Sequence, residues 1–171
     1  MRTIKSLLLI VAVFGLFGAA AGGLRAEEGD PAALAAALKN TKVTLQQGLK
    51  AGERLGKPIS AKFEIEHGQL QLSVYTQKGK DFSEAIVDLK TGAVAKAEKI
   101  SDAGDYKEAE EQSAAMAKAK VSLVSAADSA AKANAGFRAV GITPELKDGH
   151  PTAEVNLLQG TTFKKVAAKL D

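Results

Sequence analysis

Two histidines are the side chains of this sequence best suited to chemistry, and each stands beside a glycine in a similar setting. They are His67 and His150, with Glu66 and Asp148 close by in the sequence. Imidazole is a common ligand of transition metals, and a carboxylate can add an oxygen ligand. If the two segments come together, His67 and His150 are candidate metal ligands. The alternative is that an exposed turn tolerates a polar residue there.

The rest of the sequence predicts no catalytic site. The chain has no cysteine, which excludes thiol chemistry, thiolate metal sites and disulfides. No nucleophile motif frames a serine, and no glycine-rich loop between a strand and a helix is present for phosphate binding. Glu64 and Glu66 lie two residues apart, so one strand face could hold both carboxylates. Alternating charge on a solvated strand face is the commoner reason for that spacing. We therefore expect neither an enzyme nor a cofactor.

The N-terminal residues predict an exported protein. Two basic residues precede an apolar run over residues 7–21, and small and then acidic residues follow it. This is the order of a secretory signal peptide, and the run is shorter than the roughly 20 apolar residues of a membrane span. A signal peptide over residues 1–26, cut after Ala26 or after Ala21, is favoured over an uncleaved anchor. We expect a periplasmic or secreted protein that meets the membrane only before cleavage.

The charge balance excludes nucleic acid as a partner. Three of the 23 basic residues lie within residues 1–26, whereas all 20 acidic residues lie beyond, so the mature chain has 20 of each. Nucleic-acid binding relies on clustered positive charge that neutralises phosphates. A chain of zero net charge without a basic cluster has no such surface.

Similar stretches recur about 80 residues apart. "KVTL" at residues 42–45 returns as "KVSL" at residues 120–123, and "HG" at residues 67–68 aligns with "DG" at residues 148–149. "QKGKDF" ending at Phe82 likewise returns as "LQGTTF" ending at Phe163. Three landmarks in one order at nearly one spacing indicate two copies of one module. The chain then divides into a first repeat with an N-terminal helix, a connecting helix and a shorter second repeat: residues 27–98, 99–119 and 120–171.

Each repeat is expected to be a helix packed on an antiparallel β-meander, an α+β fold. Thr44 and Ser122 are candidate N-caps of the two helices. The stretch from Ala61 to Tyr75 alternates apolar and polar residues around His67 and Gly68, and a two-residue loop there puts every apolar residue on one face.

The remaining elements follow from local patterns. Gly68 and Gly149 supply the positive φ that tight turns need. A third strand is expected at residues 81–89 and a short fourth at residues 93–97. The connecting helix is expected to begin at Asp105, an N-terminal acidic residue.

A helix capped by Thr or Ser, followed by a meander that ends in "VDLKTGAV", resembles the PepSY family. The resemblance covers residues 42–94, and its most specific part is the turn of Asp88, Thr91 and Gly92. The second repeat lacks this turn and the fourth strand. The resemblance implies a small non-catalytic module that binds or restrains peptidases and other exported proteins.

Two surfaces are candidates for such a partner, which we expect to be a peptidase or a membrane sensor of the cell envelope. One is the polar strand face with Glu64 and Glu66, and the other is the final strand with Lys164 and Lys165. Sheet edges can add a strand from another chain, although lysines are also typical of edges protected against pairing. The alternative function is a small-ligand or metal carrier whose ligand lies between two facing meanders.

Overall fold

The structure, a computed structural model, describes residues 30–171, so the expected signal peptide lies outside the described part. Its helices are α1 (Pro31–Leu38), α2 (Leu45–Gly52), α3 (Ala103–Lys118) and α4 (Leu123–Ala133). Its strands are β1 (Lys57–Glu66), β2 (Gln69–Lys78), β3 (Asp81–Val87), β4 (Val94–Lys99), β5 (Arg138–Lys147), β6 (His150–Gln159) and β7 (Thr162–Lys169). The fold is α+β, as the sequence predicts.

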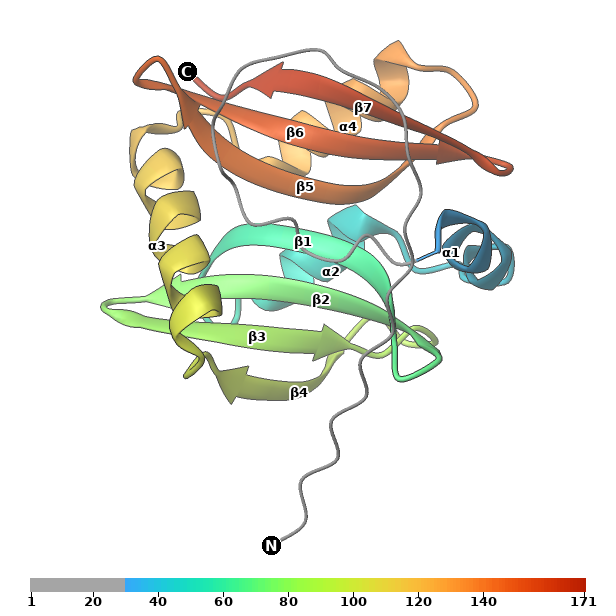
Figure 1. Ribbon diagram of the computed structural model, residues 1–171, viewed down its shortest axis with the longest axis horizontal. Coiled ribbons are helices and arrows are strands. Elements are labelled where there is room, and N and C mark those ends of the chain that lie inside the picture. The colour runs from blue at the N-terminus through green and yellow to red at the C-terminus, as the bar shows by residue number, and fades with distance from the viewer. Residues whose placement is uncertain (1–29) are drawn as a thin grey trace, which may run out of the picture.

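All seven strands form one antiparallel sheet in the order β4-β3-β2-β1-β5-β6-β7 (Figure 1). The two meanders join side by side through β1 and β5, where Ala61 pairs with Ile142 and Lys62 with Gly141. Pro144 follows these pairs in β5 and has no N–H with which to extend the ladder. The carrier hypothesis predicts two meanders that face each other across a ligand. This predicted arrangement is wrong, because the two halves lie side by side in one sheet.

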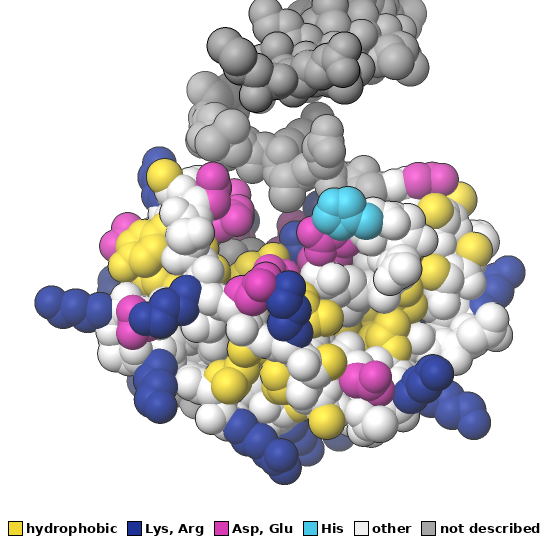
Figure 2. Space-filling model, turned by 90° about the horizontal axis from the view of Figure 1, so that it is seen from below, with side chains coloured by type: hydrophobic (Ala, Val, Ile, Leu, Met, Phe, Trp, Pro, Cys, Tyr) yellow, Lys and Arg dark blue, Asp and Glu magenta, His cyan; other side chains and the backbone are white. Residues whose placement is uncertain are grey.

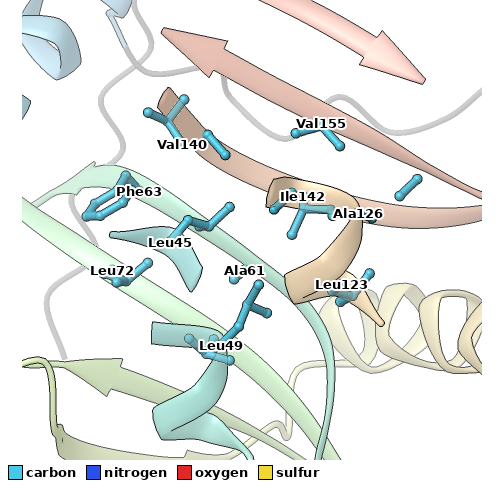
Figure 3. Close-up of a cluster of buried hydrophobic side chains, with 14 of the residues drawn as sticks. Leu45, Leu49, Ala61, Phe63, Leu72, Leu123, Ala126, Val140, Ile142 and Val155 are labelled. Atoms are coloured by element: carbon cyan, nitrogen blue, oxygen red, sulfur yellow. The ribbon is translucent and has the colours of Figure 1, made fainter. Parts of the chain in front are cut away.

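Helices α2 and α4 cover one face of this sheet, which we call the helical face (Figure 1). The main hydrophobic core lies there, and Figure 3 shows side chains of α2 and α4 against side chains of β1, β2, β5 and β6. Leu45 and Leu49 of α2 are fully buried. The two helices also touch each other, because Gln46 Nε2 donates to Asp128 Oδ1 at 2.9 Å. One core therefore spans both halves.

Local signals start the helices as predicted. Thr44 accepts from the backbone N–H of Gln47, whose side chain accepts from the backbone N–H of Thr44, so that α2 begins with a capping box. Ser122 caps α4 by accepting from Ser125 N. These contacts satisfy backbone donors that a helix leaves unpaired at its N-terminus.

Glycines let α2 approach the sheet closely. A Cβ on Gly48 would lie 2.6 Å from Leu72 Cδ2, and one on Gly52 would lie 2.7 Å from Val74 Cγ1. Both glycines lie on the buried side of α2. The four-residue spacing therefore creates a flat helix surface against β2.

Helix α3 lies on the other face of the sheet, across one end (Figure 1). Several of its contacts are polar: Ser60 Oγ donates to Gln112 Oε1, and Ser113 Oγ donates to Gln77 Oε1, both at 2.6 Å. The N-cap is Asp102, which accepts from two backbone N–H groups, so α3 begins at Ala103, two residues before the expected start, and Asp105 lies in its first turn. A nearer carboxylate takes the capping position.

The first hairpin has the predicted register. Ile65 pairs with Leu70 and Phe63 with Leu72 around the turn at His67 and Gly68, which have φ angles of 49° and 76°. Asp148 and Gly149 adopt the same conformation between β5 and β6, with φ angles of 51° and 80°. Two successive positive φ angles are typical of type I′ turns.

Three strand boundaries differ from the sequence prediction. β1 begins at Lys57 rather than at Ala61, and β3 ends at Val87, two residues before the expected end. β4 extends to Lys99. Element ends are set partly by tertiary contacts, which local patterns do not contain.

A single arginine joins the second half to the segment between α1 and α2. Arg138 at the start of β5 donates to the carbonyls of Leu38, Thr41 and Val43, at 3.4, 3.2 and 3.0 Å. Its guanidinium also lies 5.5 Å from the ring centroid of Phe63. These contacts fix α1 and its connection at the end of the sheet opposite α3.

Within residues 30–171, no helix has the length and apolar character needed to cross a bilayer.

Candidate functional site

The two histidines lie at opposite ends of the sheet. β1 and β5 are antiparallel neighbours, so the turn after β1 and the turn after β5 point in opposite directions. Counting along the strands from the Ala61–Ile142 pair puts His67 and His150 on the order of 35 Å apart. A metal site shared by His67 and His150 would require the two turns to lie together, and they do not. Among residues 30–171, no three His, Cys, Asp or Glu side chains gather as a metal-ligand set.

Each histidine instead has a carboxylate neighbour of its own. His150 Nδ1 lies 3.0 Å from Asp171 Oδ2, and His67 Nδ1 lies 3.8 Å from Glu66 Oε1. The hydrogen bond from His150 lowers the pKa of Asp171. His150 thus ties the β5–β6 turn to the end of the described chain.

Glu64 belongs to a polar cluster on the open face, which we define as the sheet face opposite α2 and α4. Its carboxylate accepts from Ser73 Oγ at 2.8 Å and pairs with Lys62 Nζ at 2.7 Å. Gln71 Nε2 donates to Ser73 Oγ at 2.9 Å, and Ser73 is fully buried. Both Glu64 oxygens therefore have partners within the sheet, whereas Glu66 lies at the exposed end of β1.

Tyr75 completes this cluster and stays a neutral phenol. Burial raises its pKa well above the usual value, and the carboxylates of Glu84, Glu64 and Asp105 raise it further. A tyrosine held in this way donates hydrogen bonds and does not act as a base near neutral pH. The open face thus shows satisfied polar groups rather than a poised acid–base pair.

The turn singled out by the sequence has a structural role. Asp88 Oδ1 accepts from Lys90 N, Thr91 N and Thr91 Oγ1 at 2.7 to 2.9 Å, and Gly92 has a φ of 73°. The backbone and hydroxyl bonds from Thr91 lower the pKa of Asp88. The charged carboxylate therefore stabilises the connection between β3 and β4.

The sheet ends at β4 on one side and at β7 on the other. In an antiparallel ladder, alternate residues direct both backbone groups to the same neighbouring strand. Leu170 N donates to Pro151 O at 3.0 Å, so Phe163, Ala167 and Lys169 of β7 direct their backbone groups away from β6. Within the described part of the chain, no strand pairs with that side of β7.

The same counting applies to the other edge. Ile100 N donates to Phe82 O at 3.0 Å, so Ala97 of β4 directs its backbone groups away from β3. Figure 2 looks onto this edge and shows side chains of both charges around small hydrophobic patches. Lys96 pairs with Glu98 at 2.8 Å, and Lys99 pairs with Asp81 at 3.2 Å. The β4 edge is therefore balanced in charge.

The β7 edge is rich in lysine. It contains Lys164, Lys165 and Lys169 and no acidic residue. Lys164 Nζ donates to the side-chain oxygen of Asn134, a neutral group, and Lys165 pairs with Glu154 of β6 at 3.2 Å. The predicted site residues Lys164 and Lys165 thus lie on an edge strand, as expected. Sequence reasoning missed the outward backbone groups at Ala167, because their direction follows from the hydrogen bond between Leu170 N and Pro151 O, which the sequence does not show.

One cleft lies beside α2. Its volume is about 450 Å³, and it is bounded by the end of α2, the start of β1 and the segment between α3 and α4. Apolar side chains such as Leu49, Met116 and Leu123 line it, and Glu53 and Lys120 lie among them. A cleft of this size is within the range of small-ligand sites.

No protein-family model matches the chain, and no curated protein matches it. Among solved structures, the chain is similar to a "putative lipoprotein" from Clostridium difficile 630. The sequence identity is 12%, the match covers 78% of this chain and 90% of that chain, and the TM-score is 0.42.

Proposed function

We propose that this chain is an exported, non-catalytic protein that binds a peptidase or a membrane sensor of the cell envelope. The signal-peptide pattern of residues 1–26 supports export. The resemblance of residues 42–94 to the PepSY family supports binding without catalysis. The partner's segment adds to the sheet as a strand beside β7, a mode in which backbone hydrogen bonds supply affinity.

The proposal includes two PepSY-like repeats of one module. In its favour, α2 precedes β1 to β4 and α4 precedes β5 to β7. Thr44 and Ser122 cap these two helices through side-chain hydroxyls. The first hairpin of each half has a turn with two positive φ angles. In this correspondence β7 is the counterpart of β3.

One observation carries the proposed binding mode. β3 pairs with β4 along its outer side, whereas the outer side of its counterpart β7 has no strand partner within residues 30–171. A partner's strand at β7 would occupy the place that β4 occupies in the first half. The sheet would then have the same number of strands on either side of the β1–β5 junction.

A pair of proline variants tests this mode. Ala167→Pro removes an outward N–H from β7, and Ala97→Pro does the same on β4, while neither removes a bond within the sheet. Both alanines are exposed. The wild type and both variants are used, after crosslinking, to capture partners from the exported fraction of the source organism, with identification by mass spectrometry.

The expected result is one protein captured by the wild type and by the Ala97→Pro variant, and lost with Ala167→Pro. A partner lost with Ala97→Pro alone, or retained by both variants, would show that β7 is not the docking strand. Circular dichroism of the variants checks that the fold is unchanged.

A carrier of a small ligand is the second candidate, and the cleft beside α2 favours it. Its apolar lining by Leu49, Met116 and Leu123 suits an amphipathic molecule. Native mass spectrometry of the freshly purified protein tests it, because a carrier arrives with added mass. A bound mass that disappears in Leu123→Trp, which fills the cleft, would favour the carrier. A protein of bare mass would weigh against it.

A further inference from the structure

We propose that a second cleft, between α1 and the start of β5, binds a small aliphatic carboxylate, an apolar chain with one anionic head. The cleft lies at the end of the sheet where β5 begins, β6 ends and α1 packs (Figure 1). It is separate from the β7 edge and from the cleft beside α2. The inference therefore goes beyond the function proposed above.

The second cleft has the size and the lining of a small-ligand site. Its volume is about 420 Å³, within the range of such sites. Apolar side chains from three parts of the chain bound it: Ala35 and Leu38 of α1, Phe137 before β5, and Leu158 of β6. Among the described residues that bound it, Gln159 is the only one with a neutral polar side chain. The lining suits an aliphatic chain better than a peptide, whose amide groups would lack partners.

The charged side chains at this cleft are all cations. Lys39 and Arg138 bound it, and no Asp or Glu of residues 30–171 does. A third cation lies close, because Lys164 Nζ is 6.0 Å from the ring centroid of Phe137, which also bounds the cleft. An anion bound here would therefore be attracted by cations from α1, β5 and β7.

The described part of the chain offers no carboxylate to these cations. The stretches that supply the cleft contain no Asp or Glu: residues 31–44, 129–144 and 155–164. Within residues 30–171, Lys39 has no ion pair, and Lys164 donates to Asn134 Oδ1, a neutral group. Lys165, which lies outside the cleft, differs from both because its ammonium pairs with Glu154. The positive charge at the cleft is thus not offset by a neighbouring carboxylate.

The guanidinium of Arg138 keeps both its charge and part of its donor capacity. It donates to the carbonyls of Leu38, Thr41 and Val43, which orient the guanidinium but carry no net charge. Arginine has five N–H donors, and these bonds use at most three of them, all on Nη1 and Nη2. Burial alone lowers the pKa of Arg138, and no carboxylate of the described chain contributes. The remaining donors, with Nε–H among them, suit a planar carboxylate.

Titration of the purified full chain with decanoate tests the inference. Three other probes accompany it: decyltrimethylammonium has the same chain with a cationic head, acetate has the head without the chain, and N-acetyl-trileucine is a peptide with the same single charge. Isothermal titration calorimetry at low salt is expected to show that decanoate binds at least about tenfold more tightly than each of the others. The backbone amide chemical shifts of the cleft residues should change on binding, at residues 35–39, 136–138 and 158–160.

Two substitutions at exposed positions of the cleft locate the site. Lys39→Glu reverses one charge, and Gln159→Glu places a carboxylate on the wall with almost no change of shape. Each should weaken decanoate binding at least about tenfold, because the new carboxylate competes for the cations. The control is Lys147→Glu, the same change of charge at an exposed residue about 30 Å along β5 from Arg138. It should alter the affinity by less than about twofold, since screening removes interactions over that distance.

Circular dichroism checks that the three variants keep the fold. Equal affinities for decanoate and decyltrimethylammonium would overturn the anionic head, and equal affinities for decanoate and acetate would overturn the apolar chain. Tighter binding of N-acetyl-trileucine would assign the cleft to a peptide C-terminus and overturn the aliphatic ligand.

The site itself can also be refuted. It is refuted if decanoate does not bind at about 1 mM, or if the chemical shifts change only around the cleft beside α2. Equal affinities of Lys39→Glu, Gln159→Glu and Lys147→Glu would refute it as well. None of these results bears on strand addition at β7, which is decided by the capture experiment.

Discussion

Replacing Arg138 should detach α1 and its connection from the sheet and destabilise the whole fold. The guanidinium donates to three backbone carbonyls, of Leu38, Thr41 and Val43. A hydrogen bond from a charged donor contributes about 1.5–3 kcal/mol, and such bonds to one group are not additive. Arg138 is only half-buried, so solvent screens part of this contribution. Arg138→Ala should therefore lower the free energy of unfolding by about 2–4 kcal/mol.

The substitution to lysine separates charge from geometry. Lysine keeps the positive charge but has no planar fork to reach three carbonyls, so Arg138→Lys should cost about half as much. Burial lowers the pKa of Arg138, yet arginine stays protonated near neutral pH, so the effect should not vary between pH 6 and 8. Arg54, which is exposed at the end of α2, provides the control: Arg54→Ala should change stability by less than about 0.5 kcal/mol.

Urea unfolding followed by circular dichroism measures these differences, with equal m-values required for the comparison. Hydrogen exchange locates the part of the fold that is destabilised. In Arg138→Ala, the backbone amides of residues 31–43 should lose protection before those of the other residues. Stability within about 0.5 kcal/mol of the Arg54→Ala variant would refute the reasoning. A loss of stability with unchanged protection over residues 31–43 would refute the assigned cause.

Three further predictions concern packing and the β3–β4 turn. Leu49→Ala should lower the free energy of unfolding in urea by about 2–5 kcal/mol, because Leu49 is fully buried. The control is Leu146→Ala at a residue that is 39% exposed, which should cost less than about 1 kcal/mol. Gly48→Ala should cost about 1–3 kcal/mol in the same assay through its clash with β2, and an unchanged midpoint would contradict the close approach. The pKa of Asp88 in the folded protein is lowered from its ordinary value of 3.8, so the charged carboxylate stabilises the fold at pH values above 3.8. This stabilisation is lost as the pH falls through the pKa of the folded state. The melting temperature of Asp88→Asn should therefore fall less on acidification than that of the wild type.

Local features of the fold could be predicted because they depend on neighbouring residues. The helix start at Thr44 follows from a hydroxyl placed before a helical run. The hairpin register around Gly68 follows from alternation and a two-residue turn. These signals lie within a few residues of the structure that they determine.

Long-range features could not be predicted in this way. Ala61 pairs with Ile142, and both are ordinary apolar strand residues whose types do not indicate a particular partner strand. No local pattern in the sequence identifies them as a pair. The position of α3 depends on polar contacts such as that of Gln112 with Ser60, which an apolar-stripe analysis does not detect. The same holds for Arg138, whose carbonyl partners are nearly 100 residues away in sequence.

For the candidate site, the sequence indicated the polar strand face and the lysine-rich final strand but not their neighbours. Glu64 is held by Lys62 and Ser73, and this follows only from the cross-strand register. The separation of His67 and His150 follows from the antiparallel arrangement of β1 and β5, which is a property of the assembled sheet.

The narrow junction between β1 and β5 has a consequence for how the chain is made. β1 is complete about 70 residues before β5 is synthesised, so its outer edge has no partner while the first half folds. An open edge is a template for pairing with another molecule. Newly made chains at high concentration are therefore exposed to exchange of their second halves, with β5 of one molecule closing β1 of another.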